Sequence, residues 1–155
     1  MWRLAVSLAL LALLVPTLSA QEGRGRSAPC EVPRNYLEAL GENQRTLLGI
    51  VYMANSAESA LDGREGGIAY YNMLASTRRY HLDLHNGLNS CAQELNLATI
   101  NTLSAAADMV VMVIARRQEP ESGWAAVRAA AAVDELNDAF NELLARTERT
   151  VLVVR

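Results

Sequence analysis

The stretch from Leu95 to Ala115 contains a single charged residue, Asp108. A segment this long and this apolar either crosses a membrane or is surrounded by the rest of the protein. The same stretch also holds asparagine, threonine and serine, which are too many polar side chains for an isolated helix that faces lipid. We therefore predict a central helix, from Cys91 to about Gln118, that other helices cover on most sides.

Three further segments show apolar residues at three- and four-residue spacing between glycine- or proline-containing breaks. They predict helices from Pro33 to Asp62, from Ile68 to His85 and from Trp124 to about Thr147. Four helices with short connections favour an all-α fold, an antiparallel up-down four-helix bundle over residues 33–149. The alternative is a three-helix bundle in which the second and third helices join into one long second helix.

The corner between residues 78 and 91 decides between these two architectures. Asn86 and Gly87 suit a left-handed cap at the end of a helix. Ser90 and Gln93 match a capping box that begins the next helix. Both features indicate two separate helices.

The first 20 residues have the pattern of a secretory signal peptide, with an apolar run from Leu4 to Val15 and small residues at the end. This run is too short to span a bilayer, which takes about 20 residues. Residues 21–32 are expected to form a flexible leader, and residues 150–155 form a tail that the pattern does not assign. We expect the protein to be periplasmic or secreted, with no membrane span after signal removal.

Cys30 and Cys91 are the only two cysteines. An even number of cysteines in an exported chain favours a disulfide bond. In an up-down bundle the first and third helices begin at the same end, so these two cysteines are expected to meet there.

Both histidines lie on the second predicted helix. His81 and His85 are four residues apart, so they share one helix face, as in helical zinc sites. Glu94 and Glu142 fall at a similar level of the neighbouring helices, which makes these four residues candidate metal ligands. The competing interpretation is a pair of core histidines bonded to polar side chains, for example Gln44 or Gln93.

The sequence lacks the patterns of the common catalytic and cofactor sites. It contains no G-x-S-x-G, no glycine-rich loop that follows a strand and no C-x-x-C-H haem motif. The formal net charge is −3 and the charges are dispersed, so no basic stripe for nucleic acid is present. We predict that the chain is not an enzyme, binds no cofactor and does not contact nucleic acid.

Residues Met109 to Ile114 are consecutive apolar positions. At 100° per residue they cover the whole circumference of a helix, so something must cover the outward ones. We expect a second copy, or another exported protein, to do so through Val111, Met109 and Met112. The predicted function is therefore that of an exported, non-enzymatic bundle acting by protein–protein contact or self-association. The alternative is a bundle that binds a metal or small ligand at His81 and His85.

Overall fold

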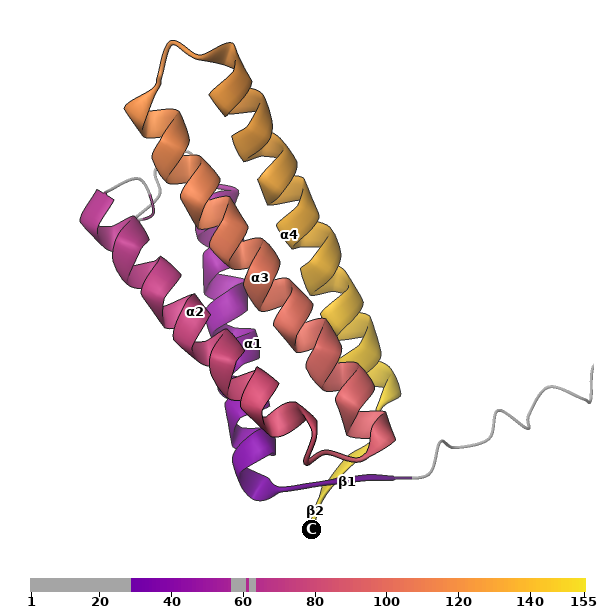
Figure 1. Ribbon diagram of the computed structural model, residues 1–155. Coiled ribbons are helices and arrows are strands. Elements are labelled where there is room, and N and C mark those ends of the chain that lie inside the picture. Colours follow the sequence, from indigo (N-terminus) through magenta and orange to yellow (C-terminus); the bar gives the residue numbers. More distant parts are fainter. Residues whose placement is uncertain (1–28, 57–60, 62–63) are drawn as a thin grey trace, which may run out of the picture.

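The chain forms a helical bundle with four helices and two short strands in the part described, which comprises residues 29–56, 61 and 64–155 of a computed structural model (Figure 1). In chain order the elements are β1 (Cys30–Val32), α1 (Arg34–Ala54), α2 (Arg64–His85), α3 (Ser90–Gln118), α4 (Gly123–Arg149) and β2 (Leu152–Val154). The predicted signal peptide, and the predicted leader up to residue 28, lie outside the described residues. α2 ends before α3 begins, so the three-helix alternative is wrong.

Hydrogen bonds between helices show how α1, α3 and α4 run past one another. Gln44 on α1 donates to Thr147 Oγ1 on α4 at 2.7 Å, and Asn55 donates to Asn137 at 3.2 Å. The residue numbers rise along α1 while those of the α4 partners fall, so the two helices are antiparallel. α4 also lies along α3, where the hydroxyl of Thr102 donates to the carbonyl oxygen of Ala139 at 3.0 Å.

α3 lies between α2 and α4 and carries the longest run of buried residues (Figure 1). By length and composition it is apolar enough to cross a membrane, but half of its most apolar window is buried inside the bundle. Three polar residues of α3, Asn96, Thr99 and Thr102, are fully buried as well. Both threonine hydroxyls lie within bonding distance of carbonyl oxygens one turn earlier in the same helix, and that of Thr102 also reaches Ala139 of α4, so neither is left unpaired. These features fit the predicted central helix.

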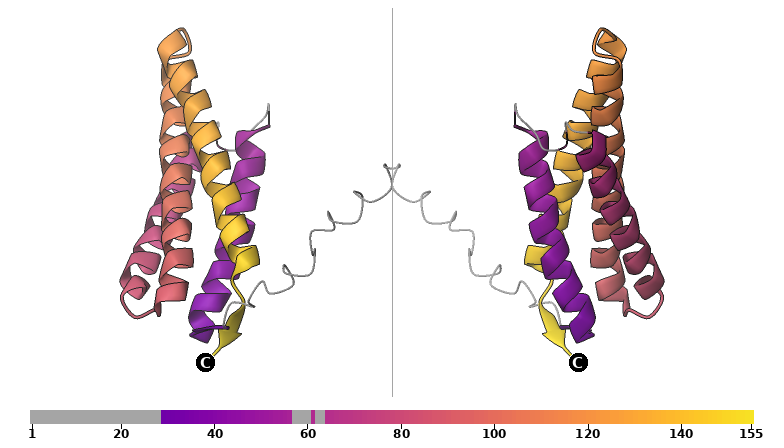
Figure 2. Two further views of the ribbon diagram at one scale, coloured as in Figure 1. Left: turned by 90° about the vertical axis from the view of Figure 1, so that its right-hand side faces the viewer. Right: turned by 90° about the vertical axis from the view of Figure 1, so that its left-hand side faces the viewer.

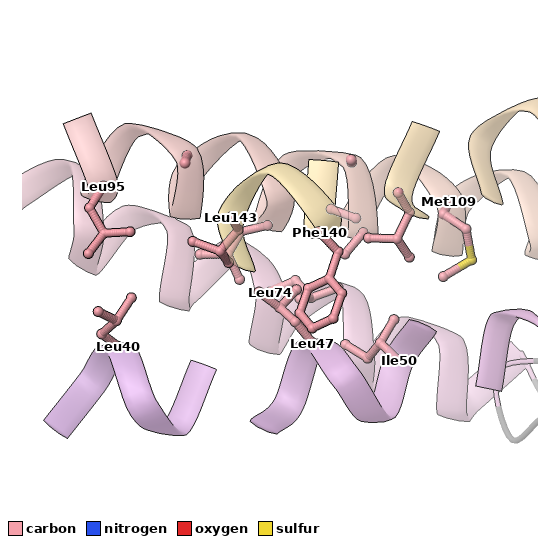
Figure 3. Close-up of a cluster of buried hydrophobic side chains, with 14 of the residues drawn as sticks. Leu40, Leu47, Ile50, Leu74, Leu95, Met109, Phe140 and Leu143 are labelled. Atoms are coloured by element: carbon pink, nitrogen blue, oxygen red, sulfur yellow. The ribbon is translucent and has the colours of Figure 1, made fainter. Parts of the chain in front are cut away.

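The apolar core lies between α1 on one side and α3 and α4 on the other. Leu40, Leu47 and Ile50 project from α1 towards Phe140 and Leu143 of α4 (Figure 3). All five side chains are buried, and their spacing along each helix is the three- and four-residue period read from the sequence.

The two ends of the described chain are fastened side by side. β1 and β2 pair in parallel, with Cys30 opposite Leu152 and Val32 opposite Val154. Cys30 is also bonded to Cys91 near the start of α3, with 6.1 Å between their Cα atoms. The predicted disulfide is present, but residues 30–32 are a strand and not part of a flexible leader. The tail, which the sequence pattern left unassigned, supplies the partner strand.

Four details of the helix ends differ from the prediction. α1 ends at Ala54 and not at Asp62, and α2 begins at Arg64 and not at Ile68. The residue that caps α3 is Asn89, whose side chain accepts a hydrogen bond from the backbone N–H of Ala92 at 3.0 Å, so Ser90 is the first helical residue and not the cap. Gly87 has no left-handed backbone conformation. Its N–H donates to the carbonyl oxygen of Leu84 and closes a right-handed last turn instead.

The loop between α3 and α4 projects beyond the ends of α1 and α2 (Figures 1 and 2). α3 has 29 residues and α4 has 27, whereas α1 has 21 and α2 has 22. At 1.5 Å per residue this difference amounts to roughly 10 Å of helix without cover from the shorter pair. The second half of α3 is therefore less enclosed than the first.

Candidate functional site

His81 lies between α1, α2 and α3, and it is fully buried. Its Nδ1 lies 2.6 Å from Oδ1 of Asn96 on α3. Its Nε2 contacts the amide Nδ2 of Asn43 on α1. Because an amide nitrogen donates, Nε2 must accept, so the ring proton is on Nδ1 and is donated to Asn96. Both ring nitrogens are thus occupied in a neutral imidazole.

Asn96 holds both histidines of the chain in place. Its amide nitrogen donates to the carbonyl oxygen of His81 at 2.9 Å and to Nδ1 of His85 at 3.2 Å. The second bond fixes the proton of His85 on Nε2, since Nδ1 accepts. One buried amide therefore orients two rings on successive turns of α2.

Aromatic rings enclose the same histidine. Tyr36 and Tyr80 both meet the ring of His81 edge to face, with centroid distances of 6.1 and 5.7 Å. Burial lowers the pKa of His81, and the hydrogen bond to Asn96 opposes this effect in part. The hydroxyl of Tyr36 is buried and has no hydrogen-bond partner among the described residues, and burial raises the pKa of this phenol.

We call His81, His85, Asn43, Asn96 and Tyr36 the buried polar cluster. Sequence reasoning found the two histidines but proposed Gln44 and Gln93 as their partners. Gln44 instead bonds Thr147, and Gln93 reaches only the carbonyl oxygen of His85. Helical periodicity could have identified the actual partners. Asn43 lies on the same helix face as Leu40 and Leu47, and Asn96 interrupts an apolar helix. A polar residue on a buried stripe needs a buried partner.

The metal site expected at His81, His85, Glu94 and Glu142 is not assembled. Glu94 and Glu142 both pair with Arg146, at 3.7 and 2.6 Å, on the exposed outer side of α3 and α4. His81 faces the interior and both of its nitrogens are bonded. Over the described ranges no three of His, Cys, Asp and Glu gather closely enough to hold a metal ion. The spacing of the histidines was read correctly, but the carboxylates point away from them.

The three residues expected at an interface have different exposures. Val111 is 40 % exposed and Met112 is half-buried, whereas Met109 is completely buried in the core. Met109 therefore fills the interior and is not available to a partner, while Val111 lies on the surface.

An exposed apolar surface surrounds Val111. The guanidinium Nε of Arg78 on α2 donates to Ser104 Oγ on α3 at 2.8 Å. α2 and α3 run in opposite directions here, since Gly67 lies against Ile114 further along. Two helical turns beyond the Arg78–Ser104 bond, the same register brings Tyr71 level with Val111. We call Ile68, Tyr71, Ala75 and Val111 the α2–α3 face.

The members of the α2–α3 face share one side of the molecule. Tyr71, Ala75 and Ile68 fall within a 60° sector of α2 at 100° per residue. Ile68 and Tyr71 are 46 % and 42 % exposed, close to the value for Val111. Exposed apolar side chains of two neighbouring helices therefore lie at the same level of the bundle.

An open cleft of about 820 Å³ lies where the end of α1 approaches the projecting part of α3 and α4. Met53, Val113 and Val133 supply apolar walls, and Arg116 and Asp134 lie at its rim. The walls belong to the half-buried margin of the core. Ser56 also lines this cleft, and among the described residues no group of three ligating side chains gathers in it.

Comparisons with family models, with curated proteins and with solved structures found no match to this chain.

Proposed function

We propose that this protein is an exported, non-enzymatic, antiparallel up-down four-helix bundle that acts by protein–protein contact through the α2–α3 face. One observation carries the proposal: Tyr71 and Val111, on two different helices, lie level with each other and remain about 40 % exposed. Single exposed apolar residues are common on protein surfaces, but a contiguous group from two helices is typical of an interface.

The expected chemistry of the surface supports contact rather than catalysis. A tyrosine combines a large apolar ring with a polar tip, which suits it to interfaces. Exposed charged residues lie beside the apolar group, with Asp108 one turn before Val111 on α3 and Arg79 one turn after Ala75 on α2. An apolar centre with a charged rim is the usual anatomy of a protein–protein interface.

The partner that this surface fits is a second copy of the chain. On α2 the exposed Glu65 and Arg79 lie seven residues to either side of Asn72, and the three side chains share one face. A two-fold axis beside Asn72 would place Glu65 of each chain opposite Arg79 of the other. Such self-complementary charge is what a symmetric contact requires.

Export is the second part of the proposal. The Cys30–Cys91 disulfide is typical of proteins in oxidising compartments. The signal-peptide pattern in residues 1–20 agrees with this location. We place the protein in the periplasm or outside the cell.

Light scattering on the mature chain, with Val111→Glu as the test variant, decides the contact. A buried glutamate carboxylate is costly, so the variant is expected to have a lower molar mass than the wild type. Leu97→Glu is the matched control, because Leu97 is 50 % exposed on the same helix but lies far from Val111. Helical circular dichroism should be unchanged in both variants. Equal molar masses for wild type and Val111→Glu would refute the proposal.

A further inference from the structure

β2 uses only one of its two edges. In the ladder with β1, the N–H of Cys30 donates to the carbonyl oxygen of Val151 at 2.7 Å, and the N–H of Arg155 donates to that of Val32 at 3.0 Å. Backbone groups of successive residues alternate between the two edges of a strand. Residues 151, 153 and 155 therefore face β1, and the N–H and C=O groups of Leu152 and Val154 face the opposite edge.

That opposite edge is open. Within residues 29–56, 61 and 64–155, β2 has β1 as its only strand neighbour, and no hydrogen bond reaches the backbone of Leu152 or Val154 on the outer side. The outer edge of β1 is different, because the carbonyl oxygen of Glu31 accepts a bond from the side chain of Asn89 at 2.6 Å. Val153 and Val154 are 37 % and 46 % exposed, so solvent reaches this end of β2.

The composition of β2 does not protect this edge. Natural proteins blunt an exposed edge with proline, a bulge or charged side chains within the strand. β2 reads LVV and follows Val151, so it consists of apolar and mainly β-branched residues, which favour pairing with another strand. Its small length is the only protective feature.

We infer that β2 pairs with β2 of a second copy, antiparallel and across a two-fold axis. Leu152 of each chain then lies opposite Val154 of the other, and the two residues exchange N–H to C=O hydrogen bonds. Val153 meets its own copy as a non-hydrogen-bonded pair, with a Cα spacing of about 4.5 Å. In this register the outward-facing N–H and C=O groups of Leu152 and Val154 all find partners on the second copy. The same residues of both chains form the contact, as two-fold symmetry requires.

The strand contact is separate from the α2–α3 face. β2 lies at the end of the bundle where the described chain begins, whereas Tyr71 and Val111 lie towards the end marked by the α3–α4 loop (Figure 1). A chain that uses both surfaces assembles beyond a dimer, and loss of either one leaves a dimer held by the other.

A cysteine scan tests the axis directly. Cys30 and Cys91 are already bonded, so a Val153→Cys chain carries one free thiol. The spacing of about 4.5 Å allows a disulfide between the two copies. Val151→Cys is the matched control, because Val151 is 55 % exposed and lies on the same face of β2 but away from the axis. We expect a cross-linked dimer on a non-reducing gel for Val153→Cys only, and equal cross-linking of the two variants would overturn the inference.

A proline substitution tests the hydrogen bonds. The N–H of Val154 faces away from β1, so Val154→Pro leaves the β1 ladder intact while removing an outward donor. In a Val111→Glu background, light scattering at submillimolar concentration should show a dimer that Val154→Pro converts to a monomer. Val154→Thr, which keeps the N–H and the β-branched shape, should remain a dimer. A monomeric Val111→Glu chain would refute strand pairing and leave the α2–α3 face intact as a proposal.

Discussion

The side chain of Asn96 accepts the ring proton of His81 at 2.6 Å and returns a hydrogen bond to the carbonyl oxygen of the same residue at 2.9 Å. Two elements, α2 and α3, are thus joined by a reciprocal pair of bonds between two buried residues. The pair sets the register of α2 on α3, because a shift of one residue would leave several buried polar groups without partners.

Replacement of Asn96 by leucine should destabilise the protein by about 1–3 kcal/mol, since the buried Nδ1–H of His81 would lose its acceptor. Urea unfolding followed by circular dichroism measures the change. Asn101→Leu is the control, as Asn101 is exposed on the same helix and should change stability by less than about 0.5 kcal/mol. Equal effects of the two substitutions would contradict the role assigned to Asn96.

The stability of the protein should depend on pH through His81. Burial lowers the folded pKa of His81 below its ordinary value of 6.5, so the unfolded chain takes up the proton first as the pH falls. The contribution is fully present above the unfolded pKa and is lost as the pH falls from about 6.5 through the lower folded pKa. The slope approaches about 1.4 kcal/mol per pH unit in that window. Urea midpoints at pH 7.5 and 5.5 should differ in the wild type and differ less in His81→Gln.

The hydroxyl of Tyr36 should cost stability rather than supply it. This hydroxyl is buried without a hydrogen-bond partner among the described residues. On folding it therefore loses its hydrogen bonds to water and gains none in return. Tyr36→Phe is expected to raise the free energy of unfolding by up to about 1 kcal/mol. Tyr80→Phe provides the comparison, because Tyr80 is exposed and its hydroxyl accepts a bond from Asn35 at 3.5 Å. A large loss of stability in Tyr36→Phe would show that the hydroxyl has a partner after all.

The disulfide should stabilise the bundle through the unfolded state. Cys30 and Cys91 are 61 residues apart, and a closed loop of that length corresponds to about 4 kcal/mol in the chain-entropy treatment. The double variant Cys30→Ala, Cys91→Ala should lose roughly this amount in urea unfolding. Intact-mass measurement of the non-reduced wild type should show no free thiol, and two free thiols would contradict the bond.

Periodicity predicted most of the secondary structure, because four long segments repeat apolar residues at the helical spacing. The disulfide followed from cysteine count and topology. The ends of α1 and α3 were less accurate, since asparagine, serine and proline all suit such positions and only tertiary contacts choose among them. Asn89, for example, caps α3 while it also bonds the backbone of β1.

The pairing of the two strands and the clustering of the polar side chains could not be predicted from the sequence. β1 and β2 have three residues each and lie at opposite ends of the described chain, so no local pattern could indicate that they pair. The four candidate metal ligands are not brought together for a similar reason. Helical spacing established that His81 and His85 share a face, but whether Glu94 and Glu142 approach that face depends on how α3 and α4 rotate about their axes.

The parallel pairing of β1 with β2 gives the domain a defined response to force. A pull applied at residue 29 and at residue 155 acts along the two strands in opposite directions and loads their hydrogen bonds in shear. Because Cys30 is bonded to Cys91, part of this load passes directly into the start of α3, whereas α1 and α2 lie off the loaded path. Once the strands separate, the Cys30–Cys91 bond prevents residues 31–90 from being stretched. Only the chain that follows Cys91 can then lengthen. The small sheet and the disulfide therefore resist such a pull before the helices can be drawn apart.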